Sequence, residues 1–165
     1  TATFIAVPYA LRDLHGMPPA GHWRIYLAVF AASIALTLPL VLWSERSPRP
    51  GRVMLAGGVL LVAALAALAW VTADLRLTAA ALALYFGAFN FLEARLPASL
   101  SLAAGEASRG AALGVFATCQ FAGAFAGGFA GGALLGSPWA LPGVYLCAAL
   151  IAIGWLPLAI RAESR

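Results

Sequence analysis

Residues 53–71 read VMLAGGVLLVAALAALAWV, a stretch that has no charged side chain and almost no polar group. A helix of about 20 such residues crosses a hydrocarbon core of about 30 Å. Four further stretches have similar length and also lack charge: residues 26–43, 77–92, 111–135 and 139–160. We therefore expect nearly the whole chain to be helix embedded in lipid.

The composition excludes an ordinary water-soluble domain. Of the 165 residues, 63% are hydrophobic and 10% are charged, against about 45–50% and about 25% in a typical soluble domain. At bilayer depth the backbone must satisfy its own hydrogen bonds, so only helices or closed barrels can span. The apolar stretches are continuous, whereas barrel strands alternate. The sequence therefore predicts an all-α polytopic membrane protein with one transmembrane helical domain over residues 1–165.

The polar interruptions set the expected boundaries of the spans. Residues 1–11 are apolar and are interpreted as the end of a span whose beginning is missing. Ser108 is a plausible N-cap for the helix that begins near Arg109. Full spans are expected at about 23–43, 53–72, 77–103 with a kink near Pro97, 109–135 and 139–160.

The ten basic residues of the chain are all arginine, and they fall in the connections between the spans. The expected topology places seven of them on one side of the membrane: Arg46, Arg49, Arg52, Arg95, Arg109, Arg161 and Arg165. The other side receives Arg12, Arg24 and Arg76. The positive-inside rule then predicts a cytoplasmic C-terminus. The net charge of +4 needs no nucleic-acid partner to explain it.

Glycine recurs every four residues along the fourth full span, in the series Gly123, Gly127, Gly131 and the series Gly128, Gly132, Gly136. Small residues at this spacing let two helix backbones approach closely in lipid, where van der Waals contact drives association. The ridge predicts a tightly packed partner helix. Because the spacing is common in membrane helices, it fits static packing as well as a moving interface.

Asn90 and Glu93 are expected to share a helix face with Phe86 and Phe89. An ionisable residue at membrane depth usually faces a bundle interior or a wet cavity. Glu93 is therefore a candidate for proton exchange. The alternative is that Glu93 lies at the cytoplasmic interface and pairs with Arg109.

Gln120 lies about ten residues into its expected helix and needs a hydrogen-bond partner at that depth. It lines a cavity together with Phe116, or it bonds to a neighbouring helix. Tyr85 is a further candidate for the substrate pathway, with packing as its alternative role.

Enzyme and metal-site signatures are not found in the sequence. His15 and His22 are seven residues apart and lack a third ligand, which makes them a poor metal site. The sequence contains no His-Glu-x-x-His, no Gly-x-Ser-x-Gly and no phosphate-binding glycine loop. We therefore expect no enzymatic activity, no metal and no cofactor.

Two stretches resemble a known family: residues 90–97, NFLEARLP, and residues 108–123, SRGAALGVFATCQFAG. They are similar to helices ten and eleven of the major facilitator superfamily, closest to its drug-efflux-like YajR branch. The resemblance extends along all 165 residues if residues 1–11 end helix seven and the full spans are helices eight to twelve. The charge-derived topology agrees, since helix twelve ends inside the cell in this family.

The resemblance also suggests a cytoplasmic gate or latch. Glu45-Arg46 and Gly51-Arg52 are similar to fragments of the charge latch that the family carries in the corresponding loop of its first half. The prolines of the loop lengthen the spacing, and the leading glycine is absent. A latch formed by Glu45, Arg46, Arg52 and Arg109 is one interpretation, and an ordinary positive-inside loop is the other.

The resemblance implies secondary active transport, with a small molecule exported by proton antiport through alternating access of two six-helix halves. This chain then supplies the C-terminal half. Its expected partners are the lipid bilayer, a small-molecule substrate with protons, and the missing N-terminal six-helix half. The expected location is the bacterial inner (plasma) membrane. The alternative is a non-transporting membrane scaffold that binds a partner helix through its glycine ridge.

Overall fold

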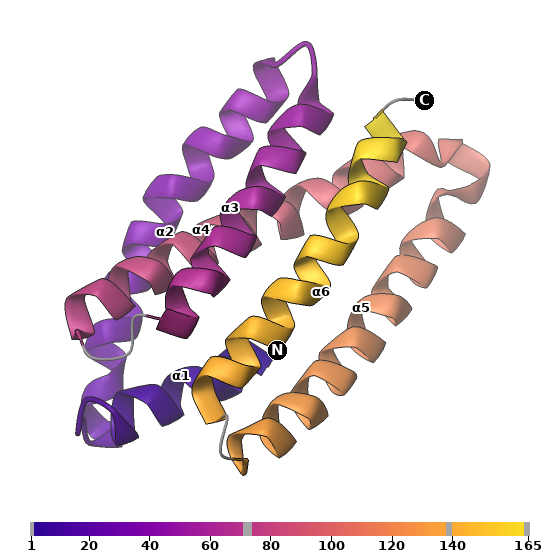
Figure 1. Cartoon of the computed structure of the whole chain (residues 1–165). Helices are drawn as coiled ribbons and strands as arrows, with labels where there is room; N and C mark the ends of the chain where they lie inside the picture. The colour runs from indigo at the N-terminus through magenta and orange to yellow at the C-terminus, as the bar shows by residue number, and fades with distance from the viewer. Residues whose placement is uncertain (1, 71–73, 138–139, 164–165) are drawn as a thin grey trace.

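The computed structural model describes residues 2–70, 74–137 and 140–163 (Figure 1). These ranges contain six α-helices and one short 3-10 turn, η1 (Pro19–Gly21), and no strand. The helices are α1 (Ala2–Asp13), α2 (His22–Arg46), α3 (Pro50–Trp70), α4 (Leu75–Ala103), α5 (Gly105–Leu135) and α6 (Ala140–Glu163). Five of them, α2 to α6, are long and apolar enough to cross a membrane. The expected all-α polytopic architecture is confirmed.

The ends of α4 and α5 show why these helices begin where they do. Asp74 caps α4, because its carboxylate accepts hydrogen bonds from the backbone N–H groups of Arg76 at 2.7 Å and Leu77 at 3.4 Å. The helix then continues through Pro97 to Ala103. Gly105 has a φ of +66°, which a residue with a side chain rarely adopts, and it separates the two helices.

The proposed N-cap at Ser108 is wrong. Helix α5 already begins at Gly105, with Ala104 as its N-cap residue. Ser108 lies in the first turn, where its hydroxyl donates a hydrogen bond back to the Ala104 carbonyl oxygen. Serine at a helix start has this alternative because its hydroxyl can bond the carbonyl four residues earlier.

The helices run back and forth across the bundle, as Figure 1 shows. The α2–α3 connection, the α4–α5 turn and the end of α6 lie at one end, the upper end in the figure. The α1–α2 connection, the end of α5 and the start of α6 lie at the other end. Helix α4 crosses the bundle and contacts α2, α3 and α5, while α3 also packs along α6.

Two clusters of buried side chains hold the helices together. The larger one joins α1, α3, α4 and α6, and its fully enclosed members include Leu11, Leu68, Leu82 and Val144. The smaller one joins Val53 of α3 to Phe91 and Leu92 of α4. Helix α3 lies close to α4 at Gly57, where an added Cβ would lie 2.6 Å from the Phe91 ring.

Helix α5 is the least enclosed element. None of its most apolar 18-residue window is buried. Phe121, Phe125 and Phe129 recur every four residues on its surface and are 75%, 79% and 76% exposed. The long apolar face of α5 is therefore largely uncovered within this chain.

The glycine ridge of α5 meets a partner at one point. At Gly131, the buried glycine of the helix, an added Cβ would lie 2.9 Å from the Ala2 side chain of α1. At Gly123 and Gly132 nothing lies within 4 Å of such an atom. Gly127 lines the cavity described below, and Gly128 is half-buried. Within the described residues, the ridge is occupied only in part.

The packing at Gly57 yields a stability prediction. Gly57→Ala is expected to lower the free energy of unfolding by about 1–3 kcal/mol, because the fully buried Phe91 ring has no free space to move into. Gly154→Ala in α6 is the matched control and should be neutral or slightly stabilising, since its methyl group meets nothing within 4 Å. Thermal unfolding of the two full-length variants in detergent compares them. Equal unfolding temperatures would contradict the close packing of α3 on α4.

Candidate functional site

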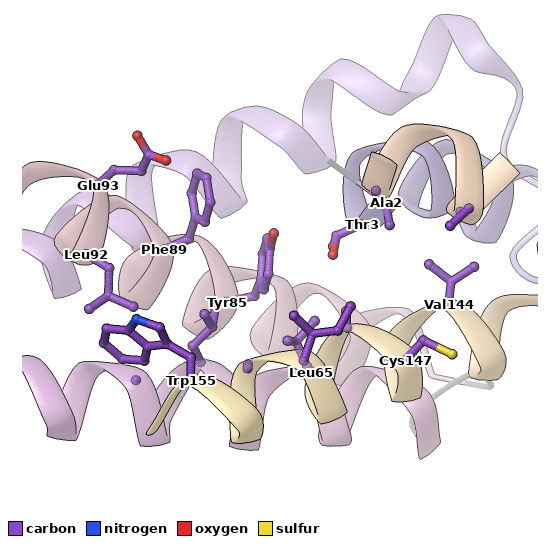
Figure 2. A pocket seen from close by; sticks show the side chains of 18 of the residues that line it. Ala2, Thr3, Leu65, Tyr85, Phe89, Leu92, Glu93, Val144, Cys147 and Trp155 are labelled. Atoms are coloured by element: carbon purple, nitrogen blue, oxygen red, sulfur yellow. The ribbon is translucent and has the colours of Figure 1, made fainter. Parts of the chain in front are cut away.

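A cavity of about 450 Å³ lies between α3, α4, α5 and α6, with the start of α1 at one side (Figure 2). Leucine, alanine, glycine and aromatic side chains form most of its wall. Figure 2 shows Glu93 and Trp155 toward one end and Cys147 and Val144 toward the other. We call this space the Glu93 cavity, because Glu93 is the only formally charged side chain among the residues that line it.

Helix α4 supplies two aromatic side chains and the carboxylate to the wall of the Glu93 cavity. Tyr85, Phe89 and Glu93 follow one another at four-residue spacing, which places them on one stripe of the helix. Trp155 of α6 faces them near Leu92 (Figure 2). The cavity therefore combines aromatic surface with a carboxylate near one end.

Asn90 and Phe86 do not line this cavity. They line a second cavity of about 350 Å³, together with Phe4 and Val7 of α1 and Tyr26, Val29 and Phe30 of α2. We call it the Asn90 cavity. The single face expected from the sequence is thus divided, because residues 86 and 90 lie one position further round the helix than residues 85, 89 and 93.

Four aromatic rings form the boundary between the two cavities. Phe4 of α1 meets Phe86 edge to face with ring centres 5.3 Å apart, and it meets Phe89 at 6.1 Å. Tyr85 contacts Phe86 at 5.2 Å and stacks on Phe89 at 5.9 Å with an angle of 14°. We call these four rings the aromatic partition, since two of them line each cavity.

A hydrogen-bonded pair joins α4 to α5 at Glu93. The amide nitrogen Nε2 of Gln120 donates to Oε1 of Glu93 at 2.6 Å and to Oε2 at 2.8 Å. Hydrogen bonds to an ionised carboxylate are shorter and stronger than those between neutral groups. Of the two roles considered for Gln120, the structure shows the bond to a neighbouring helix. Phe116 is half-buried and is not among the residues that line either cavity.

The alternative pairing of Glu93 with Arg109 is not seen among the described residues. Arg109 instead donates its Nε–H to the carbonyl oxygen of Ser101 at 3.2 Å. Glu93 lies ten residues before Ala103, the last residue of α4, or about 15 Å along a helix that rises 1.5 Å per residue. Arg109 stays close to the turn, so the two side chains lie at different depths.

The residues proposed for the latch lie around the α2–α3 connection. Glu45, Arg46 and Arg52 are all exposed. Arg52 lines a shallow pocket with Trp43 and Arg49. In the part of the chain that the structure describes, no ion pair joins Glu45 to either arginine. Arg109 lies at the same end of the bundle, on the first turns of α5 (Figure 1).

Sequence reasoning missed the contribution of α1 and α6 to the Glu93 cavity. Thr3, Cys147 and Trp155 line it, yet none of them was singled out from the sequence. Helix α6 is apolar on all sides, so its hydropathy gives no hint of an inward face. Trp155 offered one signal, because tryptophan in membrane proteins is enriched at the interfaces and this one lies within a span.

Comparison with known proteins gives one informative relative. No protein-family model matches the chain. The inner membrane transport protein YajR of Escherichia coli (strain K12) is 33% identical over 158 residues, which is 96% of this chain and 34% of that protein. The chain thus spans about one third of the length of this curated relative. The resemblance to the YajR branch of the major facilitator superfamily is confirmed, and the six helices are consistent with a C-terminal half.

The bond between Glu93 and Gln120 yields a prediction about α5. Gln120→Leu should lower the free energy of unfolding by about 1 kcal/mol, since the carboxylate loses its donor from the neighbouring helix and both side chains are exposed within the described chain. Thr118→Val is the matched control, because the Thr118 hydroxyl bonds only within its own helix, to Gly114 at 2.9 Å. Thermal unfolding of the full-length variants measures the difference. A Thr118→Val variant as unstable as Gln120→Leu would show that the interhelical bond contributes nothing.

Proposed function

We propose that this chain, similar over nearly its whole length to an inner membrane transport protein, forms part of a secondary transporter of the bacterial inner membrane. In this proposal, a small amphipathic molecule is exported in exchange for protons. The observation that carries the proposal is the carboxylate of Glu93 on the wall of an otherwise apolar cavity between membrane-spanning helices. Ionisable residues in such positions are typical of substrate and proton pathways.

Glu93 is proposed to carry the proton. As a carboxylate it accepts both hydrogen bonds from Gln120 on α5. A proton on one oxygen turns that oxygen into a hydroxyl, which donates a hydrogen bond and accepts more weakly than a carboxylate oxygen does, so the two bonds from the amide nitrogen are weakened. Protonation thus changes the contact between α4 and α5 at the cavity wall. An antiporter needs such a group, which responds to a proton where the substrate binds.

The Glu93 cavity suits an amphipathic substrate. Its volume of about 450 Å³ lies within the range of about 300–1,000 Å³ that is typical of small-molecule sites. Tyr85, Phe89 and Trp155 offer aromatic surface to an apolar body. Thr3 and Glu93 offer a small number of polar contacts, which is the usual way in which such a site fixes orientation.

The uncovered face of α5 supports a second half as the partner. Phe121, Phe125 and Phe129 are exposed there, and Gly123 and Gly132 leave room for a close backbone approach. We propose that an N-terminal six-helix half packs on this face. Rocking of the two halves would then open the site to each side of the membrane in turn.

The arginine-rich end of the bundle is proposed to face the cytoplasm. The α2–α3 connection, the α4–α5 turn and the end of α6 share this end (Figure 1). Glu45, Arg46, Arg52 and Arg109 lie there and are the candidates for a gate between the halves. The C-terminus is then cytoplasmic.

A membrane scaffold is the second candidate function, because an open α5 face would also accept a partner helix from another protein. The two functions differ in what precedes Thr1 in the gene. Six further membrane spans upstream support the transporter, and none supports the scaffold.

The role of Glu93 is tested by Glu93→Gln in the full-length protein. This variant keeps the shape of the side chain but cannot exchange a proton, so proton-driven transport into inverted vesicles should fall at least tenfold while folding is retained. Glu106→Gln is the matched control, since Glu106 is exposed in the first turn of α5. Unchanged transport with a normal pH dependence in Glu93→Gln would contradict the proposal.

The orientation is tested by a matched pair of cysteine variants, each exposed at one end of the bundle. Ala20→Cys lies in η1, and Ala107→Cys lies in the first turn of α5. In spheroplasts, a membrane-impermeant maleimide should label Ala20→Cys at once and Ala107→Cys only after permeabilisation. The background carries alanine at Cys119 and Cys147. The opposite pattern of labelling would place the arginine-rich end outside.

A further inference from the structure

The Asn90 cavity differs in chemistry from the Glu93 cavity. Its volume is about 350 Å³, and aromatic rings from α1, α2 and α4 form most of its wall. No residue that lines it carries a formal charge at neutral pH. Among its lining side chains, Asn90 alone has an amide. The cavity is therefore an uncharged aromatic space with two hydrogen-bonding side chains, the Asn90 amide and the Tyr26 hydroxyl.

The Asn90 amide lacks a protein partner in the part of the chain that the structure describes. No hydrogen bond joins its side chain to another described residue. Asn90 lies within the apolar span of α4 and is half-buried. A polar group in an apolar environment costs about 1–3 kcal/mol when it stays unpaired, so this amide is expected to gain its partner from a bound molecule.

The aromatic partition keeps the two cavities apart. Phe4 and Phe86 face the Asn90 cavity, and Tyr85 and Phe89 face the Glu93 cavity. A ligand in the Asn90 cavity would therefore contact Phe4 and Phe86. These two rings pack against Tyr85 and Phe89, which line the Glu93 cavity. The ligand would not need to contact Glu93.

We propose that the Asn90 cavity is a second ligand subsite, which takes an uncharged aromatic group that bears one hydrogen-bonding atom. The aromatic rings bind the flat body, and Asn90 binds the polar atom as donor or acceptor. The proposal rests on the transport function proposed above, because it assigns part of the substrate pathway to uncharged molecules. It predicts that neutral and cationic ligands depend on different residues.

The test measures binding of two probes with the same ring system to the full-length protein in lipid nanodiscs. One probe is 2-naphthol, which is uncharged at neutral pH and has one hydroxyl, and the other is naphthylmethylammonium, which is a cation. Saturable binding above that of empty nanodiscs is measured for the native protein and for four variants. These are Asn90→Leu, Phe30→Ala, Glu93→Gln and, as the control for truncation of an exposed apolar side chain, Leu150→Ala in α6.

The affinity for 2-naphthol should fall about fivefold in Asn90→Leu, the loss expected for one hydrogen bond between neutral groups. Phe30→Ala should weaken it to a similar extent, and this variant provides a second test if Asn90→Leu fails to fold, because Phe30 is 54% exposed. Leu150→Ala and Glu93→Gln should leave it unchanged, because neither residue lines the Asn90 cavity. The cationic probe should instead lose affinity in Glu93→Gln.

Two results would overturn the subsite. The first is the absence of saturable 2-naphthol binding to the native protein, which would mean that lipid or another part of the protein fills the cavity. The second is a loss of 2-naphthol binding in Glu93→Gln but not in Asn90→Leu or Phe30→Ala. The proposed proton role of Glu93 is tested separately. If transport by Glu93→Gln kept a normal pH dependence, that role would be wrong, but the 2-naphthol binding result would still support the subsite.

Discussion

The structure depends on a constraint set by the hydrocarbon core, where water neither satisfies backbone groups nor drives apolar surfaces together. Each segment must therefore be helical, and the helices must hold one another by close contact and by polar bonds. Gly57 lets α3 approach α4 at the Phe91 ring. The Thr37 hydroxyl of α2 shares its proton between the Ser33 carbonyl oxygen of its own helix at 2.8 Å and the Gly87 carbonyl oxygen of α4 at 3.2 Å. The bond from Gln120 to Glu93 attaches α5 to α4 in the same way, with a charged acceptor.

Helix α4 organises the candidate site because it crosses the bundle and contacts α1, α2, α3 and α5. One stripe of α4 faces α6 and lines the Glu93 cavity, and the next stripe faces α1 and α2 and lines the Asn90 cavity. The short helix α1 makes this division, since Phe4 packs against Phe86 and Phe89 between the two stripes. A charged and an uncharged space thus lie on opposite sides of four aromatic rings.

Helix α5 connects the site to the open side of the chain. Its inner contacts are the bond at Gln120 and the close approach of Gly131 to Ala2. Its outer face presents Phe121, Phe125 and Phe129. The chain spans about one third of its curated relative. The proposed cover for this face is the N-terminal half. In that arrangement, a change at Glu93 would reach the interface between the halves through one helix.

The sequence by itself determined the membrane environment, the all-helical class and the superfamily resemblance, because uninterrupted apolar stretches such as residues 53–71 have one stable solution in lipid. It also indicated Glu93 and Gln120, since polar groups at that depth need partners. Only the tertiary structure decided that they bond to each other, that Arg109 stays near the turn, and that Asn90 faces a separate cavity. Hydropathy does not fix how an apolar helix is rotated or which neighbour it meets, because every face of α6 is equally soluble in lipid. Those choices follow from the fit of Phe91 against Gly57 and of Trp155 against Gly58, and from the packing of Phe4 on Phe86 and Phe89.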